Sequence, residues 1–345
     1  MPVRIFISEF VTGGGWSEEV TPVGLAAEGK AMLLACVEDF SRIPGCDVLW
    51  TWDERLGNPP VSAGHVAVVS GPQEESNAFE QAARQANATL VIAPEFDSIL
   101  LNRVRRVEQW GGQLLGPNSQ AVNVCSDKLR TAETLTSADV RVVPTFLLEN
   151  HHQLAPQSRY VVKPRDGAGS SMIATVHGSD VTPARCGRRD EIWQPFVEGV
   201  ALSVSLLASE DRQRIDVMPT GLQRLSNDGL FRYQGGLIPA DISPSVEAEI
   251  DRLTRRSIEA IPGLKGYVGF DLLLPADGTG PTIVEINPRM TTSYLGYRRL
   301  GRHNLAEAMF RGVDGPLEWR TEPVEFAADG SFAAISSSFV ERTKR

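Results

Sequence analysis

The stretch Glu285-Ile286-Asn287-Pro288-Arg289 gives the strongest structural signal in this chain of 345 residues. It ends a predicted strand, and a turn rich in Gly, Pro and Asp joins that strand to an earlier one at 268–274. Because side chains alternate along a strand, we expect Glu285 and Asn287 on one face, with Asp271 opposite Glu285 in the hairpin. Two carboxylates and one amide oxygen suit Mg²⁺, which usually adds phosphate and water oxygens. Asp271, Glu285 and Asn287 are therefore the predicted magnesium ligands, and Mn²⁺ could take the same place.

The alternative is that these three residues are ordinary solvated strand positions. Apolar neighbours such as Phe270 and Ile286 argue against it, because they place both strands in a core. A carboxylate pair buried there without a cation would be costly. Arg289 follows Asn287 by two residues, and its planar guanidinium could hold a transferred phosphoryl group or an acyl phosphate, or could only neutralise Glu285.

Lys163 stands directly before a loop rich in glycine and serine, residues 164–171. Glycines let backbone N–H groups approach phosphate oxygens, and serine hydroxyls add donors. The loop has neither the GxxxxGK[ST] nor the GxGxxG spacing, so a plain turn stays the alternative. Lys128, near the start of a predicted helix, lies where anions are favoured, unless it is an exposed surface lysine. The predicted phosphate-contacting residues are Lys128, Lys163, Gly167, Gly169, Ser170 and Ser171.

The segment Gln194-Pro195-Phe196-Val197-Glu198 is predicted to be extended and to join two parts of the chain. An extended backbone can pair its N–H and C=O groups with the edge of an adenine, while Phe196 or Val197 packs near the base. The alternative is an ordinary linker between domains. A hinge that also binds nucleotide would satisfy both interpretations.

The first third of the chain alternates strands and helices, which is typical of an open parallel α/β sheet with ligands beyond the C-terminal strand ends. The pattern changes near 117 and becomes strand-rich after 199, so we expect three parts, at 1–116, 117–198 and 199–345. Strands are expected at 3–10, 66–70, 89–93, 144–148, 160–163, 172–176, 192–196, 202–208, 214–224, 268–274 and 282–287. Helices are expected at 25–40, 74–85, 99–110, 127–138, 246–261 and 304–312.

The composition restricts the partners of this chain. Its formal net charge of -9 makes it a poor general binder of nucleic acid or anionic membranes, so bound phosphate should lie in a local pocket. Four cysteines without CxxC spacing are expected to be buried or free thiols in a reducing cytoplasm. The sequence shows no membrane-span length and no signal-peptide pattern. Small-molecule substrates are expected, and a homodimer stays open.

The order of the signals is a lysine, a lysine with a glycine-rich loop, a Q-x-F-x-E-G linker, an aspartate and E-x-N-P-R. This order resembles the ATP-grasp superfamily over roughly Pro117 to Arg302. The resemblance implies an ATP-grasp architecture, α/β and α+β, with an N-terminal open parallel α/β domain, a small lid and a C-terminal antiparallel sheet. It implies ATP with two Mg²⁺ as cofactors, and adenine held along 194–198. It also implies Lys128, Lys163 and Arg289 as the catalytic cations, with Arg289 steadying an acyl phosphate.

Two positions depart from the family pattern. Ala201 stands where many members have a ribose-binding glutamate, a role that Glu198 or Ser203 could fill. Gly269 stands where D-alanine–D-alanine ligases usually have an arginine, which counts against that activity.

The N-terminal segments Glu9–Gly15, Glu28–Met32 and Ala93–Asp97 are similar to the tyramine–glutamate ligase group, which serves methanofuran-type cofactor synthesis. That similarity implies γ-glutamyl transfer to an amine such as tyramine or tyrosine. The candidate substrate residues, with ordinary loop polarity as the alternative, are Glu9 and Glu95 for an amine and Ser293, Tyr294 and Arg298 for the carboxylate substrate.

Three other functions stay open at this point. The chain could be an ATP-binding regulator without catalysis. It could be a nicotinamide-dependent enzyme, although Gly13-Gly14-Gly15 lacks the fingerprint spacing. It could also be a different ATP-grasp ligase that makes a dipeptide or adds glutamate to another cofactor.

Overall fold

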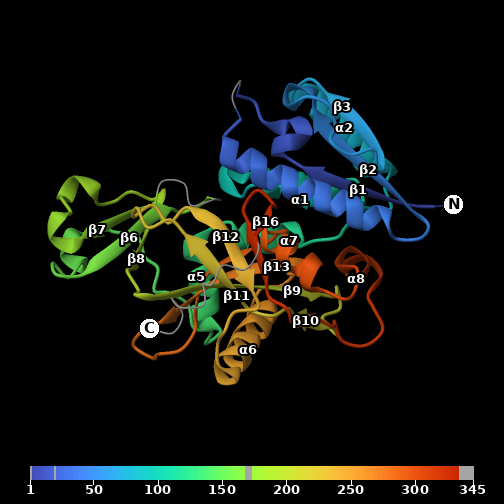
Figure 1. The fold of residues 1–345 in the computed structure, drawn as a ribbon. Helices are drawn as coiled ribbons and strands as arrows, with labels where there is room; N and C mark the ends of the chain where they lie inside the picture. The colour runs from blue at the N-terminus through green and yellow to red at the C-terminus, as the bar shows by residue number, and fades with distance from the viewer. Residues whose placement is uncertain (1, 19–20, 168–172, 334–345) are drawn as a thin grey trace.

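The strands form three separate sheets in the residues that the computed structural model describes, 2–18, 21–167 and 173–333 (Figure 1). The first sheet has the order β3-β2-β1-β4-β5 and is parallel throughout, as expected. Its strands are β1 (Val3–Glu9), β2 (Cys46–Asp53), β3 (His65–Val69), β4 (Ala88–Ile92) and β5 (Gln113–Leu114). Its helices are α1 (Val23–Ser41), α2 (Pro72–Gln85) and α3 (Ile99–Gln109), with the short turns η1 (Val11–Gly15), η2 (Glu54–Leu56) and η3 (Phe96–Ser98).

Strand β1 shows why this sheet is covered on both faces. Ile5 and Ile7 join a core that contains α1, whereas Phe6 joins a second core with α2 and α3. A parallel strand with helices on both sides has apolar residues on both of its faces, so the run Ile5-Phe6-Ile7 predicted this strand.

The second sheet is a small antiparallel lid with the order β7-β6-β8. It comprises β6 (Arg159–Pro164), β7 (Ala174–His177) and β8 (Glu191–Pro195), with the turns η4 (His151–Gln153), η5 (Gly178–Asp180) and η6 (Pro183–Arg185). The predicted strand at 144–148 was wrong, because only Phe146 pairs there, in an isolated bridge to Trp193. Leu148 instead packs into the separate core of the lid.

The third sheet is antiparallel and has the order β14-β13-β9-β11-β12-β15-β16. Strand β10 pairs with the C-terminal end of β9. Its strands are β9 (Gly199–Ala208), β10 (Ile215–Val217), β11 (Gly221–Leu225), β12 (Tyr233–Ile238), β13 (Gly266–Pro275), β14 (Thr282–Asn287), β15 (Val324–Ala327) and β16 (Phe332–Ala333). The strand predicted at 214–224 is thus two strands. Helices α4 (Ser119–Cys125), α5 (Lys128–Ser137) and α6 (Pro244–Ala260) share a core with this sheet.

The expected division at 116/117 and 198/199 stays a prediction. The three sheets fall on the expected sides of both limits. Helices α4 and α5, which we expected with the lid, pack against the third sheet.

Helices α7 (Ser293–Leu300) and α8 (Leu305–Arg311) join the first domain to the third sheet. Figure 1 shows α1 lying over the region of α7, and their buried side chains belong to one core. Tyr294 donates a hydrogen bond to Asp39 over 2.8 Å, and Arg298 pairs with both Asp39 and Glu38. No helix among the described residues has the length and apolar character needed to cross a bilayer.

Candidate active site

A cavity of about 560 Å³ opens between the lid, the third sheet and the end of the first domain. It collects most of the residues expected to do chemistry. The predicted residues that line it are Lys163, Gln194, Pro195, Phe196, Val197, Glu198, Asp271, Glu285, Asn287, Arg289 and Ser293.

The predicted metal ligands lie together at one wall of this cavity. In the β13–β14 pair, Asp271 lies opposite Glu285, as expected for the hairpin. Asn287 Nδ2 donates to Asp271 over 3.1 Å, and Gln223 donates to the other carboxylate oxygen over 2.6 Å. Three oxygen-bearing side chains therefore converge, although only two are acidic. No cluster of three or more His, Cys, Asp or Glu side chains that could hold a metal occurs in the described parts of the chain.

A register shift makes this convergence possible. Asp271 pairs with Glu285, but the next residue, Leu272, pairs with Ile283, so Val284 is an extra residue in β14. Val284 and Glu285 both line the cavity, while Ile283 and Ile286 are buried in the core behind the sheet. The simple alternation expected from the sequence is therefore broken by a β-bulge.

The two acids differ in protonation because their neighbours differ. Burial, together with the Glu285 charge, raises the pKa of Asp271 to about 7. Burial also acts to raise the pKa of Glu285, but Lys128 and Lys163 outweigh it and hold that pKa at about 2. Glu285 is therefore ionised at neutral pH. Asp271 becomes fully ionised there only if a cation binds next to it.

The two predicted phosphate-binding lysines flank Glu285. Lys163 Nζ is 3.4 Å and Lys128 Nζ 3.8 Å from Glu285 Oε2. Burial lowers the pKa of Lys163 and outweighs the charge of Glu285, which acts to raise it. The charge of Lys128 lowers this pKa further. Lys128 also donates to the carbonyl of Gly167 over 2.8 Å, which links the helix α5 to the glycine-rich loop. Gly169, Ser170 and Ser171 lie outside the described residues, so their predicted phosphate contacts stay predictions.

The far end of the cavity is apolar and aromatic. Phe196 lies 6.2 Å from Phe231 between ring centroids, and the Arg159 guanidinium sits 4.0 Å from the Phe196 ring centre. Arg159 also pairs with Glu198 over 2.6 Å. A flat base fits between such surfaces. The adenine contacts of 194–198 and the ribose contact of Glu198 or Ser203 stay predictions.

Arg289 is held from the first domain. Its guanidinium makes two bonds to Glu95, of 2.8 and 3.2 Å, and both side chains are largely buried. Glu95 was expected to bind an amine, but its two oxygens face Arg289 instead. The pair positions Arg289 at the inner end of the cavity, next to Asn287 in the chain.

The other predicted substrate residues divide into two groups. Ser293 lines the cavity and lies 3.4 Å from Ser203. Tyr294 and Arg298 do not line it, because they bind α1 at the domain interface. Glu9 is also turned away, since it accepts hydrogen bonds from the backbone of Val11 and Thr12. These three side chains therefore act in the structure of the domain and its interface.

Sequence reasoning missed Glu28, Gln223 and Tyr233, which also line the cavity. Glu28 lay in a motif that we singled out but to which we gave no role. Gln223 lies on β11 and Tyr233 on β12, which pair with each other but reach β13 and β14 only through the order of the whole sheet, so no local pattern places these side chains in the cavity.

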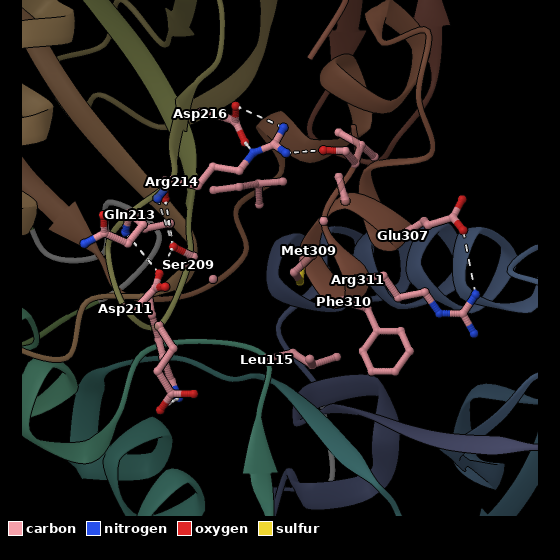
Figure 2. A pocket seen from close by; sticks show the side chains of 18 of the residues that line it. Leu115, Ser209, Asp211, Gln213, Arg214, Asp216, Glu307, Met309, Phe310 and Arg311 are labelled. Atoms are coloured by element: carbon pink, nitrogen blue, oxygen red, sulfur yellow. Dashed lines mark hydrogen bonds and ion pairs between the residues drawn. The ribbon is translucent and has the colours of Figure 1, made fainter. Parts of the chain in front are cut away.

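A second cavity, of about 710 Å³, lies between β5, the β9–β10 hairpin and α8 (Figure 2). Arg214 pairs there with Asp216 and donates to the carbonyl of Val313, and Arg311 lies 3.8 Å from Glu307. No residue predicted to bind nucleotide, metal or substrate lines this cavity. The chemistry therefore belongs to the first cavity.

Family models agree with this geometry. The model of the ATP-grasp domain matches residues 125–293, and that of the pre ATP-grasp 3 domain matches residues 46–122. The chain belongs to the ATP-grasp superfamily. The first cavity lies within this matched region, apart from Glu28.

Similar proteins cover nearly the whole chain. It is 27% identical over 328 residues to the tyramine–L-glutamate ligase of Methanocaldococcus jannaschii, covering 94% of each protein. It is 29% identical over 325 residues to the enzyme of the same name from Methanocaldococcus fervens, covering 93% of this chain and 98% of the relative. An ATP-grasp superfamily protein of Archaeoglobus fulgidus has a similar crystal structure, with 25% identity, a TM-score of 0.71, and 94% and 92% of the two chains covered.

A more distant structure shows the fold alone. The L-amino acid ligase of Bacillus licheniformis has 15% identity and a TM-score of 0.68, over 94% of this chain and 79% of that one. Family, relatives and cavity together identify the ATP-grasp chain as an ATP-dependent, amide-forming carbon–nitrogen ligase.

Proposed function

We propose that this ligase joins the γ-carboxylate of L-glutamate to an aromatic amine such as tyramine or tyrosine, with release of ADP and phosphate. The observation that carries the proposal is one cavity with lysines and oxygen ligands along its wall and Arg289 at its inner end. The two relatives that match more than nine-tenths of the chain are named for tyramine and L-glutamate. The reaction would belong to methanofuran-type cofactor synthesis.

The wall formed by Asp271, Glu285 and Asn287 has the donors that Mg²⁺ prefers, because all three offer oxygen atoms. The raised pKa of Asp271, at about 7 through burial and the adjacent Glu285, supports this fit, since a divalent cation would favour two ionised carboxylates. Bound Mg²⁺ would supply positive charge against the phosphate oxygens.

The protein groups would act in two stages. Lys128 and Lys163 orient the phosphates while a carboxylate oxygen of glutamate attacks the γ-phosphorus and ADP leaves. Arg289, fixed by Glu95, holds the resulting acyl phosphate. The amine gives up one proton to solvent, and its nitrogen lone pair then attacks the acyl carbon. The C–N bond forms, phosphate leaves with the C–O electron pair, and the nitrogen releases a second proton to give the neutral amide. A closed lid would keep water from competing with the amine.

The site also argues against a D-alanine–D-alanine ligase. A Cβ atom at Gly269 would lie 2.6 Å from Thr291 Cγ2, so this position has no space for any side chain. The arginine that such ligases usually have there cannot be accommodated without moving Thr291.

The test is a release assay for ADP, with L-glutamate and a panel of amines, in which product masses are measured. We expect ADP release to require both substrates and the product to be the γ-glutamyl amide of an aromatic amine. ADP release with other carboxylates but not with glutamate would refute the substrate assignment. Nucleotide binding without any amine-dependent turnover would favour a regulator.

A further inference from the structure

Glu28 is a carboxylate of the active-site cavity that the reaction described above does not use. It lies in the second turn of α1, a helix of the first domain (Figure 1), and it is one of the residues that line the cavity. The lid and the third sheet supply nearly all the other lining residues. A ligand that enters the cavity from the side of the first domain would therefore contact Glu28.

The other acidic residues of the cavity have partners within the protein. Glu285 lies between two lysines, Asp271 accepts bonds from two amides, and Glu198 pairs with Arg159. Within the described parts of the chain, no hydrogen bond or ion pair engages Glu28. The nearby Arg289 acts on it only through its charge and is itself bound to Glu95.

The position of Glu28 is well defined by packing. The next residue, Gly29, is so close to β1 that a Cβ atom there would lie 2.7 Å from Glu9 Oε1. At the other end of α1, Asp39 is bound by Tyr294 and Arg298. Helix α1 is thus fixed against both β1 and α7, and a fixed acid without a partner is suited to a cationic ligand.

The second substrate of the ligase is such a cation. A primary amine is an ammonium ion at neutral pH, and its nitrogen must come close to the acyl group held by Arg289. Glu28 is close enough to that guanidinium to feel its charge. The ring of Tyr233, on β12, lines the same cavity and offers an aromatic surface to an aryl amine. We propose, building on the ligase function above, that Glu28 binds the ammonium group of the amine substrate.

The test compares Glu28→Gln with the wild type in steady-state kinetics. We expect the KM for tyramine to rise about 10- to 100-fold, as for the loss of a charge-assisted hydrogen bond. The KM values for ATP and glutamate should change less than about twofold, because other walls of the cavity bind them. Lys30→Gln, an exposed position on the same helix, is the control and should leave all three constants unchanged.

A neutral analogue separates charge recognition from a change in shape. Tyrosol has a hydroxyl group in place of the ammonium group, so its inhibition constant against tyramine should change little in Glu28→Gln. If inhibition by tyrosol weakens as much as tyramine binding, or if the KM for glutamate rises alone, Glu28 does not recognise the amine. An unchanged KM for tyramine would also overturn the proposal.

Two further measurements keep the result interpretable. Thermal melting shows whether Glu28→Gln is folded, and Glu28→Asp, which keeps the charge, should lie between the wild type and Glu28→Gln in its KM for the amine. If the wild type uses a different carboxylate substrate, the assigned glutamate substrate is wrong, and the same comparison is made with that carboxylate and its amine.

Discussion

The Glu28 carboxyl group should contribute to the pH dependence of the stability of the folded protein, and Glu28→Gln should remove that contribution. Burial raises the pKa of Glu28 from its ordinary value of 4.5 to about 6, against the opposing charge of Arg289. Between these two values the folded protein binds more protons than the unfolded chain. The free energy of unfolding contributed by this group therefore falls as the pH rises from about 4.5 to about 6, and stays low above that.

The size of the effect follows from the two pKa values. They differ by about 1.5, and each pKa unit corresponds to about 1.4 kcal/mol, so an ionised Glu28 costs the folded protein about 2 kcal/mol. This is an upper limit, because the side chain is only partly buried and water screens its charge.

The assay is urea unfolding of wild type and Glu28→Gln at pH 4 and pH 8, without nucleotide. We expect similar stability at pH 4, and a variant more stable by up to about 2 kcal/mol at pH 8. Glu38 on the same helix is a control of opposite sign, because its hydrogen bond to Arg298 lowers its pKa. Glu38→Gln should lose stability at pH 8 and regain wild-type stability in acid. Equal or lower stability of Glu28→Gln at pH 8 would refute the reasoning.

Two further perturbations test the metal wall and the packing of α1. Asp271→Asn or Glu285→Gln should lower ATP turnover by a factor of about 10²–10³. The melting temperatures of both variants should stay near that of the wild type. Near-normal ADP release by both variants would contradict the assignment of these residues as metal ligands. Gly29→Ala should cost about 1–3 kcal/mol of unfolding free energy, because the new methyl group would lie 2.7 Å from a Glu9 oxygen. Gly24→Ala, in open space on the same helix, should be neutral or stabilising by up to about 1 kcal/mol, so equal effects in denaturant unfolding would contradict this account.

Local patterns were sufficient for the parts of the fold with strong periodicity or strong turns. The β13–β14 hairpin is one example, because apolar alternation and a Gly- and Pro-rich turn both favour it. Strand β2 was missed although it is an inner strand of the first sheet, paired with both β1 and β3. Its residues, Cys46–Asp53, mix acids with two tryptophans, and their burial depends on neighbours that are remote in the sequence.

The site was predictable where chemistry is carried by adjacent residues, and not where two domains meet. Lys163, Glu285 and Arg289 were placed correctly in one cavity. The bond between Glu95 and Arg289 joins residues 194 positions apart, so no spacing rule could reveal it. Arg298 was misplaced for the same reason, since the helix α7 turns it towards α1 instead of the cavity.

The extra residue in β14 has a consequence for protein engineering. Because of the bulge at Val284, Glu285 points into the cavity while the apolar residues on both sides of this pair stay in the core. A host hairpin with regular pairing would send either Glu285 or Ile283 to the wrong face, even with the complete stretch Glu285-Ile286-Asn287-Pro288-Arg289 grafted into it. The transferable unit is therefore both strands with their mismatch in length, and deletion of the single residue Val284 should be more damaging than most substitutions in the same strand.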